Sequence, residues 1–317
     1  MKTNPWGAPL LSLFTACLLC ASCRTHPPVG LAPVPPPEAE VLDLSDYRTD
    51  LAKCREAAEL GEPLAQYEMG LRYEEGRGVH NDLVRAARWY LRAAEGGLMV
   101  AQHNMAVIYL NGDGVAQDHE AARTWFERAA AGGSTESQFG LGRMMERGWG
   151  GPVDAKGAAQ WYGRAAEQGL ARAQHALGRL CEAGVGLPVD YQAALQWYLA
   201  AAEQGDLDAC YAIGRMYARG TGVVRDPLEA IVWFRSAAIR GHAPSQYSLG
   251  ALYLNGDGVK KDRLTAYAWL KLAQRDGDSD AAKLCAQLEE RMTPEEKKEA
   301  GARVRQVSRE IKPSARR

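Results

Sequence analysis

The sequence predicts an all-α fold, a right-handed α/α superhelical solenoid of helix-hairpin repeats with a 36-residue period. Two observations lead to this prediction: tryptophans recur every 36 residues, and aspartates and two series of glycines keep the same step. A fixed period in this range is typical of stacked repeats, in which each unit covers the apolar face of the next. The periodic positions are Trp89, Trp125, Trp161, Trp197, Trp233 and Trp269; Asp82, Asp118, Asp154, Asp190, Asp226 and Asp262; Gly97, Gly133, Gly169, Gly205, Gly241 and Gly277; and Gly76, Gly112, Gly148, Gly184, Gly220 and Gly256.

Each unit is expected to be two helices joined by a glycine-rich turn. In the second unit, apolar residues at helical spacing predict a first helix over Leu98 to Leu110. A turn with two glycines follows, and Asp118 is placed to cap a second helix that runs to about Ala131. Small residues let the helices approach closely, and the tryptophan is expected to fill the space between them. The expected contact positions are Ala101, Met105, Ile108, Tyr109, Ala121, Trp125, Ala129 and Ala130.

The periodic residues resemble the Sel-one-like repeat (SLR) family, a relative of the tetratricopeptide repeats. The resemblance covers about 230 residues and rests on the combined motif rather than on any one residue. Three positions depart from the motif: Trp149 to Gly151 lacks the valine, Cys210 replaces a glutamine, and Ala106 replaces a glycine. We expect local repacking there. The first matching unit carries Ala65-Gln66-Tyr67, Met69-Gly70, Tyr73, Gly76-Arg77-Gly78-Val79, Asp82, Ala86, Trp89-Tyr90, Ala93-Ala94 and Gly97.

The ends of the array are expected to be capped. Six repeats are predicted over residues 61–276, after a degenerate repeat helix within residues 45–60, over Asp46 to Leu60. Residues 277–317 are expected to hold capping helices and a tail. One helix is predicted over Ser279 to Glu290, and a charged last helix is predicted to begin at Thr293-Pro294. Terminal helices of a solenoid need a polar outer face because no neighbour covers them.

The N-terminal residues have the order of an export signal. Lys2 is followed by a largely apolar run from Ala8 to Leu19 and then by small residues before Cys23. Residues 1–22 are predicted to be a signal peptide that resembles a lipoprotein signal, with Cys23 as the lipidated residue. Cys20 departs from that pattern, so an uncut anchor or an ordinary cleaved signal stays open. Residues 23–44 are proline-rich and predict an extended linker.

The composition suits a folded chain but not a nucleic-acid binder. Apolar residues make up 46% of the sequence, enough for a core, and the formal net charge is −1. A dedicated nucleic-acid-binding protein usually carries a strong basic excess. No apolar run reaches the roughly 18 residues of a membrane-spanning helix.

Reactive constellations are weak, and we expect no enzyme, no metal and no cofactor. His103 and His175 share a repeat phase but are expected on the order of 20 Å apart, too far for one ion. The Gly-x-Gly turns follow helices rather than strands, unlike phosphate-binding loops. Cys54, Cys181 and Cys285 fall on apparently buried positions, and no internal disulfide is expected. Relatives described as interacting with penicillins leave a weak penicillin-binding or β-lactamase-like enzyme as an alternative, although no Ser-x-x-Lys pair is present.

The predicted function is binding on the concave face of the solenoid, which the first helix of each unit lines. Arginines on that helix could form a basic ladder, with an aromatic or histidine series beside it; the alternative is a solvated face neutralised by Glu146 and Glu182. The candidate binding residues are Tyr67, His103, Arg143, Arg147, His175, Arg179, Tyr211, Arg215, Arg219 and Tyr247.

These features predict an exported, lipid-anchored scaffold of the bacterial cell envelope, facing the periplasm or cell surface. Its expected partners are proteins or peptides, wall-associated anionic ligands, and the membrane through the lipid on Cys23. A secreted protein that engages a host or neighbouring cell is the second alternative.

Overall fold

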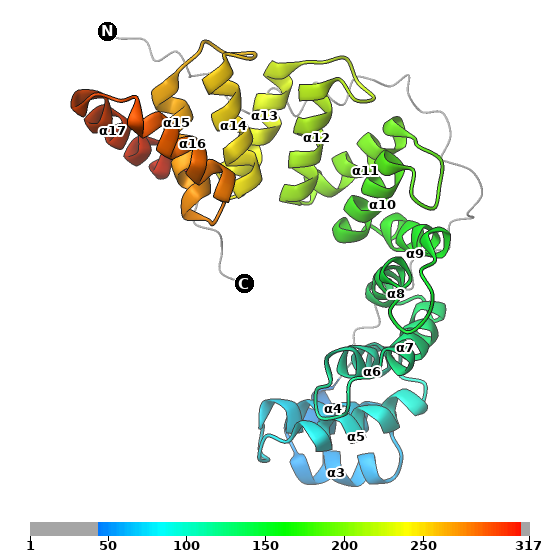
Figure 1. Ribbon diagram of the computed structural model, residues 1–317. Coiled ribbons are helices and arrows are strands. Elements are labelled where there is room, and N and C mark those ends of the chain that lie inside the picture. Colours follow the sequence, from blue (N-terminus) through cyan, green and yellow to red (C-terminus); the bar gives the residue numbers. More distant parts are fainter. Residues whose placement is uncertain (1–43, 312–317) are drawn as a thin grey trace. The chain divides into compact units, whose positions relative to one another are not determined.

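A computed structural model describes residues 44–311 of the chain. The chain divides into two units, residues 1–35 and 36–317, and every described residue belongs to the second. Residues 44–311 form α-helices joined by short turns, without a strand (Figure 1). The predicted signal peptide, Cys23 and almost all of the predicted linker lie outside the described residues. Within them, no helix is long and apolar enough to cross a membrane.

The helices alternate along the chain as first and second members of hairpins. The first helices are α4 (Pro63–Glu75), α6 (Met99–Asn111), α8 (Thr135–Arg147), α10 (Ala171–Ala183), α12 (Leu207–Arg219) and α14 (Ala243–Asn255). The second helices are α5 (Leu83–Glu95), α7 (His119–Ala131), α9 (Ala155–Glu167), α11 (Tyr191–Glu203), α13 (Pro227–Ala238) and α15 (Arg263–Arg275).

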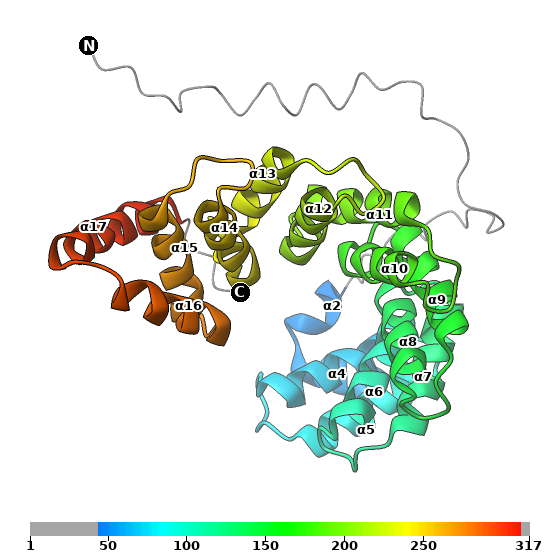
Figure 2. The ribbon, with the colours of Figure 1, turned by 45° about the horizontal axis from the view of Figure 1, so that its top comes forward.

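Each hairpin packs against the next one in chain order. Every first helix contacts its own second helix, and that second helix contacts the first helix of the following unit. The same succession of neighbours can be followed in both views (Figures 1 and 2). The prediction of an all-α solenoid of stacked hairpins is therefore confirmed.

Aspartates and glycines set the helix ends as the repeat pattern predicts. The Asp118 carboxylate accepts hydrogen bonds from the backbone N–H groups of Glu120 and Ala121, and the aspartate of every other unit caps its second helix in the same way. Each first helix ends at a glycine in the left-handed conformation, such as Gly184 with φ of 68°. Only glycine adopts that conformation without a steric cost, which explains its periodic recurrence.

The predicted role of the tryptophans is wrong for most of the repeats. Of the six periodic tryptophans, only Trp125 and Trp269 are buried. The residue after each tryptophan fills the hairpin instead, and Tyr90, Tyr162 and Tyr198 are each 1% exposed. A glycine of the first helix faces this ring: a Cβ on Gly178 would lie 2.8 Å from Tyr198. The tryptophan belongs to the neighbouring helix phase and packs at the rim of the core.

The interior positions of the second unit also shift slightly from the predicted ones. Ala101, Met105, Trp125, Ala129 and Ala130 are buried as expected. Ile108, Tyr109 and Ala121 are only half-buried, whereas Ala106, Ala122 and Phe126 are fully buried. The difference has the same cause as for the tryptophan. Each helix is rotated about its axis, so that residues next to the predicted ones face the partner helix.

Glutamines tie consecutive repeats together. The Gln138 side chain donates to the Ala130 carbonyl oxygen at 3.3 Å, at the C-terminal end of the preceding second helix. Gln66, Gln102, Gln174 and Gln246 make the same bond in their repeats. Cys210 takes this position in the fifth repeat and is buried there. The last carbonyls of a helix have no partner within it, so the periodic glutamine satisfies one of them.

The two ends differ in how well the sequence predicts them. The single helix predicted over Asp46 to Leu60 is wrong: the chain forms α2 (Ser45–Arg48) and α3 (Leu51–Glu59) instead. Asp50 caps α3 by accepting from Ala52 and Lys53 and so separates the two. At the other end, α16 (Ser279–Glu290) and α17 (Pro294–Glu310) form as predicted. Thr293 and Glu296 form a reciprocal capping box at the start of α17.

Candidate functional site

The candidate site is the solvent-exposed side of the first helices, the helices predicted to line the concave face. This surface is here called the first-helix face. In the central repeats it carries exposed or half-buried arginines from α8, α10 and α12, and most of them were predicted to form a continuous basic ladder. These arginines are Arg143, Arg147, Arg172, Arg179, Arg215 and Arg219.

The continuous ladder is wrong, because two of its members are neutralised. Arg179 forms an ion pair with Glu146, and Arg215 pairs with Glu182 at 2.6 Å. Each glutamate lies 33 residues before its arginine and therefore belongs to the preceding repeat. The alternative reading of a salt-bridged face, with Glu146 and Glu182 as the neutralising residues, holds for this part of the surface.

The two glutamates also receive a hydrogen bond from the core. Tyr162 donates to Glu146 at 2.8 Å, and Tyr198 donates to Glu182 at 2.8 Å. Partial burial raises the pKa of Glu146, but the bonds from Arg179 and Tyr162 outweigh it and leave that pKa below its ordinary value. Glu146 is thus held as a carboxylate between two repeats, which makes Arg179 a structural cation.

Three of the predicted arginines have no such partner. Among residues 44–311, Arg143, Arg147 and Arg219 have no carboxylate within ion-pair distance. For Arg143 the reason is visible in the repeat register: 33 residues earlier stands Leu110, where the next two repeats have glutamate. The charges of Arg143 and Arg147 are therefore available to a ligand.

A half-buried tryptophan lies beside this pair of arginines. Together they form a patch, called the Trp149 patch, that consists of His119, Phe139, Arg143, Arg147 and Trp149. The guanidinium of Arg147 lies 4.7 Å from the Trp149 ring centroid, and that of Arg143 lies 5.9 Å from the Phe139 centroid. His119 stacks on Trp149 with centroids 5.8 Å apart. Arginine and tryptophan are among the residue types most enriched at the energetically dominant positions of protein interfaces.

The predicted aromatic and histidine series serves packing. Tyr67, His103, His175 and Tyr211 each contact the aromatic residue that follows the tryptophan of their own repeat, with centroids between 5.5 and 5.7 Å apart. Tyr247 is partly buried against the C-terminal core cluster, to which Leu270 and Leu288 belong. Burial lowers the pKa of His103, whose Nδ1 lies 2.8 Å from the Ser137 hydroxyl. A binding role for these five residues stays a prediction.

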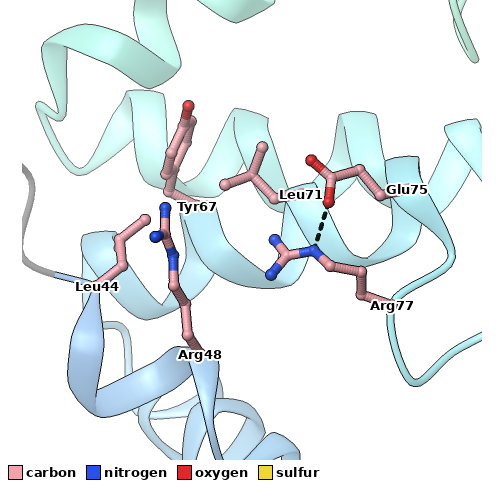
Figure 3. Close-up of a pocket in the computed structure, with 6 residues that line it drawn as sticks. All are labelled: Leu44, Arg48, Tyr67, Leu71, Glu75 and Arg77. Atoms are coloured by element: carbon pink, nitrogen blue, oxygen red, sulfur yellow. Dashed lines mark ion pairs between the residues drawn. The ribbon is translucent and has the colours of Figure 1, made fainter.

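A separate hollow of about 520 Å³ lies beside α2 and α4. Leu44, Arg48, Tyr67 and Leu71 line it, together with Glu75 and Arg77, which form an ion pair across one side (Figure 3). It includes the predicted residue Tyr67 but lies two repeats before the Trp149 patch, so the predicted residues do not gather in one pocket.

The described thiols are not activated. Cys54, Cys181, Cys210 and Cys285 are buried and free. Burial raises the pKa of Cys181 and of Cys285 to about 11. A thiol attacks as the thiolate, so these cysteines are poor nucleophiles at neutral pH.

The pattern of helices and caps agrees with a known repeat. A family model described as Sel1 repeat matches residues 63–98, 100–134, 135–170, 171–206, 207–242 and 243–278. This chain belongs to the Sel1 repeat family. Helical repeats of this kind are typical of protein-interaction scaffolds.

Solved structures give the same result. The chain is 34% identical to a protective antigen of uropathogenic Escherichia coli strains that displays an SLR fold, with a TM-score of 0.73. That match covers 83% of this chain and 56% of the antigen, so the chain spans little more than half of the longer protein. A Sel1 repeat protein from Oxalobacter formigenes is 32% identical over 74% of this chain and 99% of its own, with a TM-score of 0.61. No curated protein matches the chain.

Sequence reasoning missed Trp149 as a surface residue. The available signal was the departure of Trp149 to Gly151 from the Gly-x-Gly-Val motif of the Sel1 repeats. A tryptophan between two glycines in a turn has no helix to bury it, and Trp149 is only half-buried here. The departure that suggested local repacking therefore marks the center of the candidate site.

Proposed function

We propose that this Sel1 repeat protein is an exported, lipid-anchored scaffold of the bacterial cell envelope that binds partner proteins on its first-helix face. The Trp149 patch is the observation that supports binding at this place. It combines two arginines without carboxylate partners and a half-buried indole, on a surface where the neighbouring arginines are neutralised.

The chemistry of the patch favours an acidic segment of a partner protein. A guanidinium presents a planar set of donors that matches a carboxylate, and charge-assisted bonds of this kind are about twice as strong as neutral ones. Trp149 offers a flat apolar surface beside them. A partner peptide with a carboxylate next to an aromatic or aliphatic side chain would use both features.

The envelope location is supported by the order of the first residues, with Lys2, an apolar run and small residues before Cys23. Lipidation of Cys23 would fix the repeats to a membrane through the proline-rich linker. Mass spectrometry of the mature N-terminus tests this part: an N-terminal Cys23 carrying a diacylglyceryl group is expected, and an unmodified or uncleaved N-terminus would contradict it.

Charge reversal at the patch tests the binding proposal. The double variant Arg143→Glu/Arg147→Glu is expected to recover partner proteins from native envelope extracts at least about tenfold less efficiently, which corresponds to about 1.4 kcal/mol. Quantitative affinity capture followed by mass spectrometry measures the recovery. Both substitutions lie on the surface of α8, so the fold should survive them.

The matched control reverses two arginines of the second helices. Arg128 and Arg164 are exposed and also lie over tryptophans, at 4.5 Å from Trp125 and 4.3 Å from Trp161. The variant Arg128→Glu/Arg164→Glu has the same net charge change and should keep the partners. Equal recovery by both double variants would refute the Trp149 patch as the binding site.

A further inference from the structure

Three metal-ligating side chains lie together where the first helices of two consecutive repeats meet, and a fourth, from the next repeat, contacts one of them. One ligand atom each from His175 on α10, Asp206 at the N-cap of α12 and Asp208 in the first turn of α12 lie within 4.8 Å of one another. His242, the N-cap residue of α14, places its Nε2 3.1 Å from Oδ1 of Asp208. None of these four residues belongs to the Trp149 patch.

We propose that His175, Asp206, Asp208 and His242 bind a divalent transition-metal ion of the zinc class. Two imidazoles and two carboxylates form a donor set that suits zinc, and nitrogen ligands favour it over magnesium or calcium. The two carboxylates carry two negative charges, which balance the charge of the ion.

The surroundings orient three of the four ligands. The Ser245 hydroxyl lies 2.8 Å from Nδ1 of His242, so this ring can donate Nδ1–H to serine and turn the Nε2 lone pair toward the ion. His175 packs on Tyr198, with ring centroids 5.7 Å apart. Asp206 accepts from the Ala209 N–H through Oδ1, which leaves its second oxygen free. The second nitrogen of a metal-ligating histidine is almost always held by a hydrogen bond, as Ser245 holds Nδ1 of His242.

Rotation of the Asp208 side chain would supply the adjustment that a metal site needs here. Ligand atoms around a tetrahedral zinc ion at about 2.1 Å lie about 3.4 Å apart, so a separation of up to 4.8 Å must close. The Asp208 side chain is 68% exposed, so no packing against neighbouring atoms prevents its rotation toward an ion.

The cluster does not follow from the repeat motif. At the equivalent junction two repeats earlier, His103 takes the place of His175, but Ser134 takes the place of Asp206. His103 bonds to the Ser137 hydroxyl there. The repeat before supplies Leu170 and Arg172 at the two aspartate positions, and the repeat after supplies His242 and Pro244. In the described part of the chain, the His175, Asp206 and Asp208 group with His242 bonded to Asp208 therefore does not result from the repeat motif itself.

Calorimetric titration of the full chain with Zn²⁺ tests the proposal. Cys17, Cys20 and Cys23 are replaced with serine in every variant, so that N-terminal thiolates do not contribute. We expect saturable binding of one ion per chain with a dissociation constant below about 10 μM, equivalent to a free energy near −7 kcal/mol. Zinc should also raise the thermal unfolding temperature of the same chain.

The variants separate this site from any other. His175→Phe and Asp208→Asn should each weaken zinc binding at least about tenfold, and Ser245→Ala, which changes only a positioning residue, about tenfold. His103→Phe makes the same exchange at the equivalent position and should leave binding unchanged. Phe139 already occupies this phase in another repeat, so His175→Phe should fold, and circular dichroism of the metal-free variant checks this.

Three outcomes would overturn the proposal. They are the absence of binding up to about 1 mM zinc, an isotherm that His175→Phe and Asp208→Asn leave unchanged, and tighter binding of Mg²⁺ than of Zn²⁺. The last would show an ordinary acidic site that does not use the imidazoles.

Discussion

Replacing Arg72 with methionine is expected to destabilise the chain by about 3 kcal/mol, because it removes the buried cation of the Glu68 carboxylate and leaves only the partly exposed Arg77, 3.1 Å away, beside it. Glu68 is fully buried, and the Arg72 side chain is 7% exposed and lies 3.3 Å from it. Arg72 also donates to the carbonyl oxygens of Tyr47 and Arg48 at 2.9 Å each, and so holds α2 against α4. Chemical denaturation followed by circular dichroism measures the loss.

A second variant distinguishes loss of the ion pair from loss of packing. In Glu68→Leu/Arg72→Met no buried charge remains, so this double variant should recover at least half of the stability that Arg72→Met loses. The exposed pair of Arg85 with Asp82 is the control, and Arg85→Ala should change stability by less than about 1 kcal/mol. If Arg72→Met were as mild as Arg85→Ala, the buried pair would not anchor this end of the repeats.

Replacing Gly186 with alanine is expected to cost about 2–4 kcal/mol, the sum of backbone strain and a steric clash. Gly186 has a φ of 75°, and a Cβ there would overlap the carbonyl oxygen of Ala155 at the start of the preceding second helix. Since the obstacle is backbone, no side-chain rotation relieves it. The second glycine of the Gly-x-Gly turn is thus a docking point between consecutive repeats, and thermal unfolding measures the loss of stability.

Gly169 gives a control with the strain but without the clash. Its φ is 90°, and a Cβ there would have nothing within 4 Å. Gly169→Ala should therefore cost only the strain, about 1–2 kcal/mol, and less than Gly186→Ala. Equal costs for the two substitutions would mean that the close approach of Gly186 to Ala155 contributes nothing.

The periodic features of the fold were predictable because they act within one hairpin. An aspartate before a helix and a glycine after it have the same meaning in any context, so Asp118 and Gly184 could be assigned from spacing alone. The buried ring was misassigned because Trp197 and Tyr198 are adjacent, and only the mutual rotation of two helices decides which one turns inward.

Contacts between repeats were less accessible to sequence reasoning. The pairing of Arg179 with Glu146 depends on how far each hairpin is rotated relative to the last, which the period does not specify. For the same reason, the sequence revealed neither that Arg143 lacks a partner nor that His175 and His242 approach the same aspartate. Glu146 was recognised as a neutralising neighbour because it shares a helix face with the arginines, although its partner lies in the following repeat.

Photo-cross-linking from the first-helix face tests most directly whether this surface binds partners. A photoreactive amino acid replaces Ala183, which is exposed on the first helix α10, one repeat after Arg147. In a separate control variant it replaces Gln160, which is exposed on the second helix α9. The proposed function predicts that the captured partner cross-links from position 183 and not from position 160, and that Arg143→Glu/Arg147→Glu abolishes the product. Cross-linking from position 160 alone, or a product at position 183 that survives the charge reversal, would contradict it.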